Sequence, residues 1–600
     1  MQEIEPPSLT KEKYEILINI LDSIREESKA SGNTRYTPPH SNKDRLNSAR
    51  SRAYIHLFLK VMFGIIEFKE RERWITDDPY DGGIDAYYIE KETRQVFLIQ
   101  SKFRTTIENF ETKDIAFSEI LQMDIDRILE GELNDEEGNQ YNGKIKQLQR
   151  EIGQIEDIAR YKYRVVILAN LKNIPPQKVR TLTGGYNAEI FDFKKSYEKL
   201  VFPVISGTYF TASEITIPVD ISNKSSGTKI SYTVTTKASD CEITVLFVPA
   251  IEIAKIMSKY KNSILQYNPR SYLELEGKQV NSAIRTTIEE TSTNELALFN
   301  NGTTIISDET NINERVGIKY QAQLFIKNPQ IINGGQTSYT LSKIYEEQKE
   351  NGDLSIFNNK EILLKVITLV TNTNTRAKLQ LIDEISNATN KQTPVINADK
   401  LANDTIHKEI QSILFETSGL LYERKRGEFA DGIHNNYIPE DQIIERNLFF
   451  RLFYCTKGSI DLAVQKRLFQ KNEIKQLSEE DIKSITNIPQ AYKFYNWVLL
   501  TKNKNTKIST IEYAKIYIST LIPNESKDIS DQFAKIVDRI WHALDRKLKN
   551  KYPQFMTKRK TNTPNSTQWL EDFSYRRYFK SNLFPKDAED IIYDLHITKH

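Results

Sequence analysis

The sequence predicts an α/β protein whose last part is mainly helical. Three observations indicate this: helical patterns alternate with short β-rich runs over the first 200 residues or so, a β-rich stretch at about 207–248 begins a second alternating region, and the chain beyond about 437 reads as helical with few glycines. We therefore predict an N-terminal helix and linker, an α/β domain, a second domain of the α/β or α+β type, and a helical C-terminal region, at 1–44, 45–200, 205–430 and 437–600.

Length and composition exclude several classes of protein. The 600 residues exceed what one hydrophobic core organises. Lysine and arginine number 83 against 81 acidic residues, and this balance neither identifies nor excludes a nucleic-acid binder. Two distant cysteines, Cys241 and Cys455, exclude a disulfide scaffold. No apolar run suits a membrane span and no secretory signal is visible, so we expect a cytoplasmic protein without a membrane partner.

The first 200 residues contain helix and strand patterns in an order typical of one α/β domain. We expect helices over Leu9–Lys29, Lys43–Met62, Asp114–Leu129 and Gly143–Tyr161 and after Pro175, and strands over Ile84–Ile89, Gln95–Phe103, Tyr163–Asn170 and Ala188–Phe193.

The predicted hairpin of the first two strands could carry chemistry. If the strands pair across a turn between Glu92 and Thr93, Asp85 faces Gln100 on one side of the sheet. Lys102 lies on that side too, because strand side chains alternate. A register slip of one residue would separate the three groups.

A carboxylate, an amide oxygen and an ammonium group in one place suit a hard cation and a phosphate. Mg²⁺ (or Mn²⁺) takes oxygen ligands, so Asp85 and Gln100 are the expected metal ligands. Lys102 could orient or activate an attacking water, or neutralise a scissile phosphate. The alternative is structural: Asp-Gly-Gly is a common turn, and a Gln-x-Lys sequence often ends a solvated strand.

The residues Gly83-Ile84-Asp85 and Phe97-Leu-Ile-Gln100-Ser-Lys102 resemble the Mrr-like branch of the PD-(D/E)xK nuclease superfamily. The resemblance covers roughly residues 45–195 and implies a restriction-endonuclease-like fold. It implies metal-dependent hydrolysis of DNA, with Asp85 and Gln100 as metal ligands and Lys102 as the catalytic lysine. Relatives often carry a further Glu on the preceding helix. Here that helix has no acidic residue over 46–62, and Glu67 and Glu70 follow it.

A second resemblance covers residues 265–430. Six ordered motifs are similar to those of the AIPR family, named for abortive infection and phage resistance: Asn268-Pro-Arg-Ser-Tyr-Leu273, Val280-Asn281, Phe299-Asn-Asn-Gly302, Asn328-Pro-Gln330 with Asn333-Gly-Gly-Gln-Thr337, Ala388-Thr-Asn-Lys-Gln392 and Tyr422-Glu-Arg-Lys-Arg-Gly427. The resemblance implies a role in bacterial defence against phage, but it names no reaction.

The segment Asn333-Gly334-Gly335-Gln336-Thr337 also has a physical interpretation. A strand, a glycine pair and a helix start can direct backbone N–H groups at one point, which favours a bound phosphate. We therefore expect a nucleotide or nucleic-acid backbone site there. The alternative is a plain turn, with Thr337 capping the helix that we expect over 336–348.

Two further basic segments could contact phosphate. Glu423-Arg-Lys-Arg-Gly427 could bind it through arginine, and Arg546–Lys551 with Lys558–Lys560 could form a stripe that faces DNA. Both could equally be solvated surface.

These observations favour a bacterial defence protein with a Mg²⁺-dependent DNA endonuclease activity. RNA is an open alternative substrate, because both backbones need the same groups. A homodimer is expected, since cutting both strands with one site per chain needs two copies or two nicks. The second hypothesis is a non-catalytic sensor, or nucleotide-binding or nucleic-acid-binding protein, that acts through the Asn333–Thr337 loop.

Overall fold

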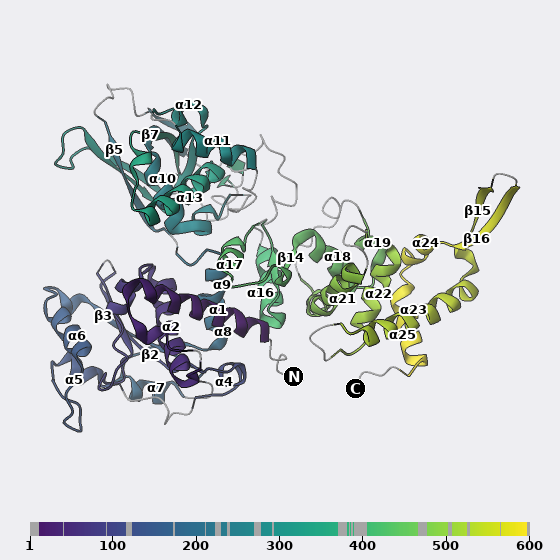
Figure 1. The fold of residues 1–600 in the computed structure, drawn as a ribbon, viewed down its shortest axis with the longest axis horizontal. Coiled ribbons are helices and arrows are strands. Elements are labelled where there is room, and N and C mark those ends of the chain that lie inside the picture. The colour runs from purple at the N-terminus through teal and green to yellow at the C-terminus, as the bar shows by residue number, and fades with distance from the viewer. Residues whose placement is uncertain are drawn as a thin grey trace. The chain divides into compact units, whose positions relative to one another are not determined.

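A computed structural model of the chain shows helices alternating with small sheets, which confirms the mixed α/β class (Figure 1). Two compact units are present: Met1–Gln392 with Gly427–Glu440, and Thr393–Arg426 with Asp441–His600. The predicted domain boundaries stay predictions. The structure describes residues 11–39, 41–91, 93–115, 123–171, 175–210, 212–221, 230–236, 240–268, 278–290, 293–369, 381–382, 384–385, 388, 405–425, 427–465, 477–501, 507–524, 529–563 and 566–596.

The N-terminal region contains a four-stranded sheet in the order β1-β2-β3-β4. Its strands are β1 Ala86–Glu90, β2 Gln95–Ser101, β3 Lys162–Leu168 and β4 Ala188–Phe191. The first two strands form an antiparallel hairpin, and β2, β3 and β4 are parallel neighbours. The carboxyl ends of the three parallel strands therefore meet at one edge, where open α/β sheets bind ligands.

Helices cover both faces of this sheet. The helices of this region are α1 Lys11–Glu27, α2 Lys43–Phe63, α3 Phe68–Arg73, α4 Ile107–Glu111, α5 Ile125–Leu129, α6 Gly143–Gly153, α7 Pro176–Leu182, α8 Phe193–Ser196 and α9 Phe202–Ile205. Ile128, Leu148 and Val179, from α5, α6 and α7, share one core cluster with strand residues. On the other face Phe63 of α2 stacks on Tyr88, with ring centroids 4.4 Å apart.

Two helix predictions were too long. Of the described residues in 114–129, only Ile125–Leu129 are helical. The N–H of Ile115 donates instead to the carbonyl of Asn170, which fixes that residue beside the end of β3. The predicted helix 143–161 ends at Gly153, and a short 3₁₀ turn follows at Ile158–Arg160. Glycine favours such an ending because it has low helix propensity.

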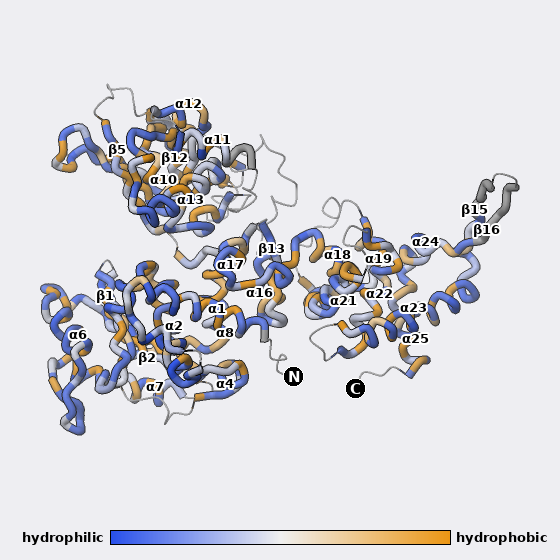
Figure 2. The backbone as a smooth tube through the Cα atoms, in the orientation of Figure 1, coloured by the Kyte–Doolittle hydropathy of each residue, from blue (hydrophilic) through white to orange (hydrophobic). Residues whose placement is uncertain are grey.

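The central region has two sheets. Their strands are β5 Glu214–Asp220, β6 Ile230–Thr235, β7 Asp240–Pro249, β8 Thr303–Ser307, β9 Glu309–Asn313, β10 Gln321–Lys327, β11 Gln330–Asn333 and β12 Glu361–Leu369. The larger sheet has the order β11-β8-β12-β7-β6, and the smaller one has the order β5-β10-β9. Helices α10 Ala250–Tyr260, α11 Lys278–Glu289, α12 Leu296–Phe299, α13 Gly335–Asn351 and α17 Ala430–His434 complete the first unit. Apolar residues gather along α10 and β12 (Figure 2).

The second unit is mainly helical around one large core. Its elements are α16 Thr405–Ser418, β13 Leu421–Glu423, β14 Ile443–Glu445, α18 Arg446–Thr456, α19 Ile460–Ala463, α20 Glu479–Thr486, α21 Ile488–Thr501, α22 Thr510–Thr520, α23 Asp531–Lys551, β15 Met556–Thr563, β16 Ser566–Phe573, α24 Tyr575–Phe579 and α25 Phe584–Asp594. The antiparallel β15–β16 hairpin was not predicted. Pro553 follows the end of α23, and β-branched threonines then favour extended chain.

Among the helices that the structure describes, none combines the length and the apolar character that crossing a membrane requires. Both cysteines are buried, and neither forms a disulfide.

Candidate functional site

A tight acidic turn precedes β1. Gly82 and Gly83 both adopt left-handed conformations, with φ of 63° and 74°, which glycine reaches without steric cost. The N–H of Gly83 donates to the Asp81 carboxylate at 2.9 Å. A Cβ atom at Gly82 would lie 2.8 Å from Cδ1 of Ile128, so the turn packs closely against α5. This geometry folds Asp81 back toward Asp85.

Residues 75–77 run beside the start of β1 and bring a third carboxylate to the turn. Ile75 forms an antiparallel bridge with Ala86. The N–H groups of Thr76 and Asp77 both donate to the carbonyl of Asp85, at 2.9 and 3.1 Å. One carboxylate oxygen from each of Asp77, Asp81 and Asp85 lies within 4.8 Å of the other two. We call these three residues the acidic cluster.

Burial disfavours the charged forms of two members of the acidic cluster, Asp85 and Asp81. Burial, together with the Asp81 and Asp77 carboxylates, raises the pKa of Asp85 to about 7. Burial, with Asp77 and Asp78 nearby, raises the pKa of Asp81 to about 6. Lys102 lowers both values, so its ammonium group acts on Asp81 and Asp85 together.

The hairpin register is the predicted one. Ala86 pairs with Ile99 and Tyr87 with Leu98, which places residues 85 and 100 at the same end of the hairpin. The N–H of Ser101 donates to the Asp85 carboxylate at 2.6 Å. In this register Asp85 lies opposite Gln100, so the two side chains lie on one side of the sheet, as predicted.

Gln100 is fully buried behind this group. Its side-chain amide nitrogen donates to the carbonyl of Gly83 at 2.8 Å, which ties the end of β2 to the glycine turn. The amide oxygen is thereby the atom that the side chain could offer to a cation. Its assignment as a metal ligand stays a prediction.

The sequence interpretation missed Asp77 and Asp81 as possible ligands. It treated Asp81 as part of a turn and looked for an extra acidic residue at Glu67 or Glu70. The Glu67 side chain is 72% exposed and its carboxylate lies 3.7 Å from Lys349, outside the acidic cluster. The available signal was the density of aspartates in Asp77–Asp85, directly before a strand.

A buried polar network supports the acidic cluster from α2. Arg52 donates to the carbonyl of Asp77, lies 3.3 Å from its carboxylate, and donates to the Tyr36 hydroxyl at 3.2 Å. His56 Nε2 lies 2.8 Å from that hydroxyl and 3.0 Å from Glu72. Burial lowers the pKa of His56 to about 4, so its ring is neutral at pH 7. Thus α2 contributes a cation, not a carboxylate, to the cluster's surroundings.

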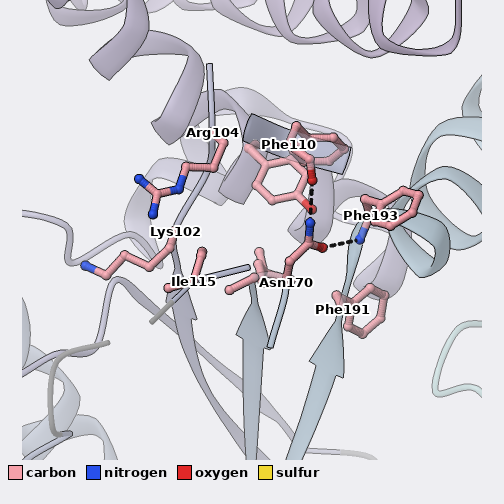
Figure 3. Close-up of a pocket in the computed structure, with 10 residues that line it drawn as sticks. Lys102, Arg104, Phe110, Ile115, Asn170, Phe191 and Phe193 are labelled. Atoms are coloured by element: carbon pink, nitrogen blue, oxygen red, sulfur yellow. Dashed lines mark hydrogen bonds between the residues drawn. The ribbon is translucent and has the colours of Figure 1, made fainter. Parts of the chain in front are cut away.

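A small pocket adjoins Lys102 at the carboxyl edge of β2, β3 and β4 (Figure 3). Asn170, after β3, forms its floor. The Asn170 side chain donates to the carbonyl of Phe110 and accepts from the N–H of Phe193 at 2.7 Å. The amide nitrogen and the amide oxygen of Asn170 thus bind two neighbouring segments and tie them to this edge.

The second predicted site lies at the start of α13. Gly334, with φ of 80°, is the residue before the helix, and no side chain caps the helix start. The Thr337 hydroxyl accepts a hydrogen bond from Asn300 at 2.9 Å, so the alternative in which Thr337 caps the helix was wrong on that point. A Cβ at Gly334 would lie 2.5 Å from the carbonyl oxygen of Gly302. Two of the AIPR-like motifs therefore meet here.

The other residues of this loop surround the same point. The side chain of Asn333 accepts from the N–H of Gly334 at 2.6 Å. A Cβ at Gly335 would lie 3.2 Å from the Asn268 amide, so the first motif reaches the loop as well. Gln336 is half-buried in the first turn of α13. Residues 269–273, 389–392 and Arg426 of the other motifs lie outside the described residues.

The basic stretch on α23 is largely neutralised. Lys547, Lys549 and Lys551 pair with Asp594, Asp545 and Asp587 at 2.7, 3.2 and 2.6 Å. These pairs match the solvated-surface alternative for this helix, since each lysine already has an acidic partner.

These features define an α/β domain with an acidic cluster beside a lysine, followed by a second α/β region with an asparagine- and glycine-rich loop. The sequence model described as AIPR protein matches residues 265–580, more than half of the chain. The chain belongs to the AIPR protein family. The match includes the α13 loop and begins well after Lys102. No curated protein matches the chain, and no solved structure does.

Proposed function

We propose that this AIPR protein acts in anti-phage defence by hydrolysing phosphodiester bonds of DNA in its N-terminal α/β domain, with Mg²⁺ or Mn²⁺. One observation carries the proposal: three carboxylates lie within 4.8 Å of one another, and Lys102 acts electrostatically on two of them. The abortive-infection role follows from the family name, and the PD-(D/E)xK resemblance of residues 83–102 supports the reaction.

The acidic cluster fits a divalent cation. Its donors are carboxylate oxygens, which Mg²⁺ and Mn²⁺ prefer. Burial raises the pKa values of Asp85 and Asp81, which disfavours their charged forms, and a bound cation would favour those forms again. Asp77, Asp81 and Asp85 would hold the ion, with Gln100 as a further oxygen donor. A bound Mg²⁺ would supply Lewis-acid polarisation of the phosphoryl group.

Side chains and backbone groups around the acidic cluster would have separate roles in the reaction. Lys102 would place its ammonium on the non-bridging oxygens of the scissile phosphate and offset the charge that develops during attack. Ser101 holds the Asp85 carboxylate through its N–H, and Arg52 holds Asp77. Gln100 fixes the turn that carries Asp81. These contacts would position the three carboxylates before substrate arrives.

A plasmid assay tests this proposal. Purified protein is incubated with supercoiled plasmid with and without Mg²⁺, beside Lys102→Ala and the control Lys91→Ala, which changes an exposed lysine at the hairpin turn. We expect cutting by wild type and by Lys91→Ala only with Mg²⁺, and its loss in Lys102→Ala. Equal cutting by Lys102→Ala would remove the role of Lys102. A parallel arm with RNA identifies the preferred backbone.

The α13 loop supports a second candidate function. The helix starts without a side-chain cap, next to two glycines, and the AIPR match covers this loop but not the acidic cluster. A sensor that binds a nucleotide through Asn333–Thr337 would bind its phosphate with backbone N–H groups at the start of α13. If no variant or condition gives cutting, but the protein binds a nucleotide and Thr337→Val does not, this function replaces the first.

A further inference from the structure

Arg104 lies two residues beyond Lys102 at the carboxyl edge of the parallel strands. The N–H of Lys102 donates to the carbonyl of Leu168 at 3.0 Å, so the chain follows β3 past the end of β2. Both Lys102 and Arg104 line the pocket at this edge. Their side chains extend to the same side, away from Asn170 and Phe193 (Figure 3).

Phe103 shows why the two cations share one side. Its ring packs inward, with centroids 5.0 Å from Tyr54 and 5.6 Å from Phe110. Since side chains alternate along extended chain, the residues before and after Phe103 point the other way. The hydroxyl of Tyr14, from α1, donates to the carbonyl of Arg104 at 3.2 Å and anchors its backbone.

Two cations in alternate positions suit a strand of phosphates. Alternate side chains of extended chain emerge about 7 Å apart, which is the order of the spacing between successive phosphates. The positive charges of Lys102 and Arg104 repel each other. A phosphodiester strand would offset this repulsion, because it carries one negative charge at each phosphate. The guanidinium group of arginine can bind phosphate with two parallel hydrogen bonds.

We infer that Arg104 binds the nucleic-acid backbone at a phosphate next to the scissile phosphate that Lys102 contacts. The acidic cluster, Lys102 and Arg104 then form one line along the substrate strand. The inference rests on the proposed function for the position of the scissile phosphate. Binding by Arg104 can nevertheless be measured without cleavage.

The experiment measures binding of a fluorescein-labelled duplex DNA by anisotropy, in EDTA and over a series of KCl concentrations. Wild type is compared with Arg104→Ala, Arg104→Lys and the control Lys162→Ala, which alters an exposed lysine at the opposite, amino end of β3. An RNA duplex of the same sequence forms a second arm, and thermal melting checks that each variant is folded.

We expect Arg104→Ala to weaken binding about tenfold at low salt, for whichever of DNA and RNA the wild type binds. The slope of log affinity against log salt concentration should fall in magnitude by about one. Arg104→Lys should retain the slope, and Lys162→Ala should bind as wild type. Wild-type affinity and slope for Arg104→Ala, or an equal loss in Lys162→Ala, would overturn the inference. If wild type cuts nothing but binds through Arg104, only the hydrolysis fails. If wild type cuts and Arg104→Ala binds normally, only this inference fails.

Discussion

The acidic cluster before β1 and the loop before α13 are both glycine turns rich in polar side chains, but their charges are balanced differently. In the first, burial raises the pKa values of Asp85 and Asp81, so folding brings together acidic groups whose charged forms are disfavoured there. In the second, the polar groups are uncharged, and Asn300 and Thr337 bind each other. An unbalanced charge costs stability that a bound cation can recover, whereas a satisfied neutral network needs no ligand to be stable.

The largest effect should come from the carboxylate that the sequence did not reveal. We expect Asp81→Asn to lower the rate of Mg²⁺-dependent plasmid cutting at least about 100-fold, because it removes one charged donor from the acidic cluster. Glu67→Gln, which alters an exposed carboxylate outside the cluster, should cut as wild type. Normal cutting by Asp81→Asn would show that Asp85 and Lys102 suffice.

Gly334→Ala tests the architecture of the other loop. Its Cβ would lie 2.5 Å from the Gly302 carbonyl oxygen, in a left-handed conformation that alanine disfavours. We expect the free energy of unfolding to fall by about 3 kcal/mol, measured by urea denaturation. Gly352→Ala serves as the control, because it is also left-handed but has open space around its Cβ. Equal losses in the two variants would mean that backbone conformation alone, not close packing, requires Gly334.

The unbalanced charge predicts a mutation that stabilises the protein while it damages the site. At pH 8 without divalent ions, Asp85→Asn should be about 2 kcal/mol more stable than wild type, since it removes a buried charge yet still accepts the Ser101 N–H. Excess Mg²⁺ should stabilise wild type and leave the variant unchanged. If Asp85→Asn is less stable than wild type both with and without Mg²⁺, the claim that ionised Asp85 destabilises the metal-free protein is contradicted.

The His56 network gives a smaller, pH-dependent effect. The folded-state pKa of about 4 lies below the usual 6.5, so the unfolded chain binds the proton first on acidification. This group therefore contributes stability that is fully present above about pH 6.5 and is lost as pH falls toward 4. Between pH 7.5 and 5 we expect wild type to lose about 1 kcal/mol more than His56→Gln in urea denaturation. Equal losses of stability in wild type and His56→Gln would contradict the lowered folded-state pKa of His56.

Local sequence patterns predicted the strand register but not the convergence of distant groups. Alternating apolar residues in β1 and β2 fix the pairing of Ala86 with Ile99, because a slip would expose the core side. The apolar run of β3 predicted a strand, but not its parallel pairing with β2. Asp77 escaped notice because its position depends on backbone hydrogen bonds to Asp85, which no periodicity encodes.

Sequence patterns also failed to predict contacts between distant residues in other parts of the chain. The amphipathic pattern of α23 predicts a helix, but not that its lysines are paired with Asp587 and Asp594, which lie some 36–47 residues further along the chain. The alternative interpretation of the loop made Thr337 the cap of α13, because threonine is a good capping residue near a helix start. Tertiary contact with Asn300 instead engages its hydroxyl.

Titration of the metal-free protein with Mn²⁺ by isothermal calorimetry tests the central claim most directly. Wild type, Asp81→Asn, Asp85→Asn and Asp78→Asn are compared; Asp78 neighbours the cluster but binds Arg35 at 2.6 Å. We predict one site in wild type and in Asp78→Asn, and its loss in both other variants. Absence of a site in wild type, or wild-type affinity in Asp81→Asn and Asp85→Asn, would contradict the claim that these carboxylates gather to hold a divalent ion.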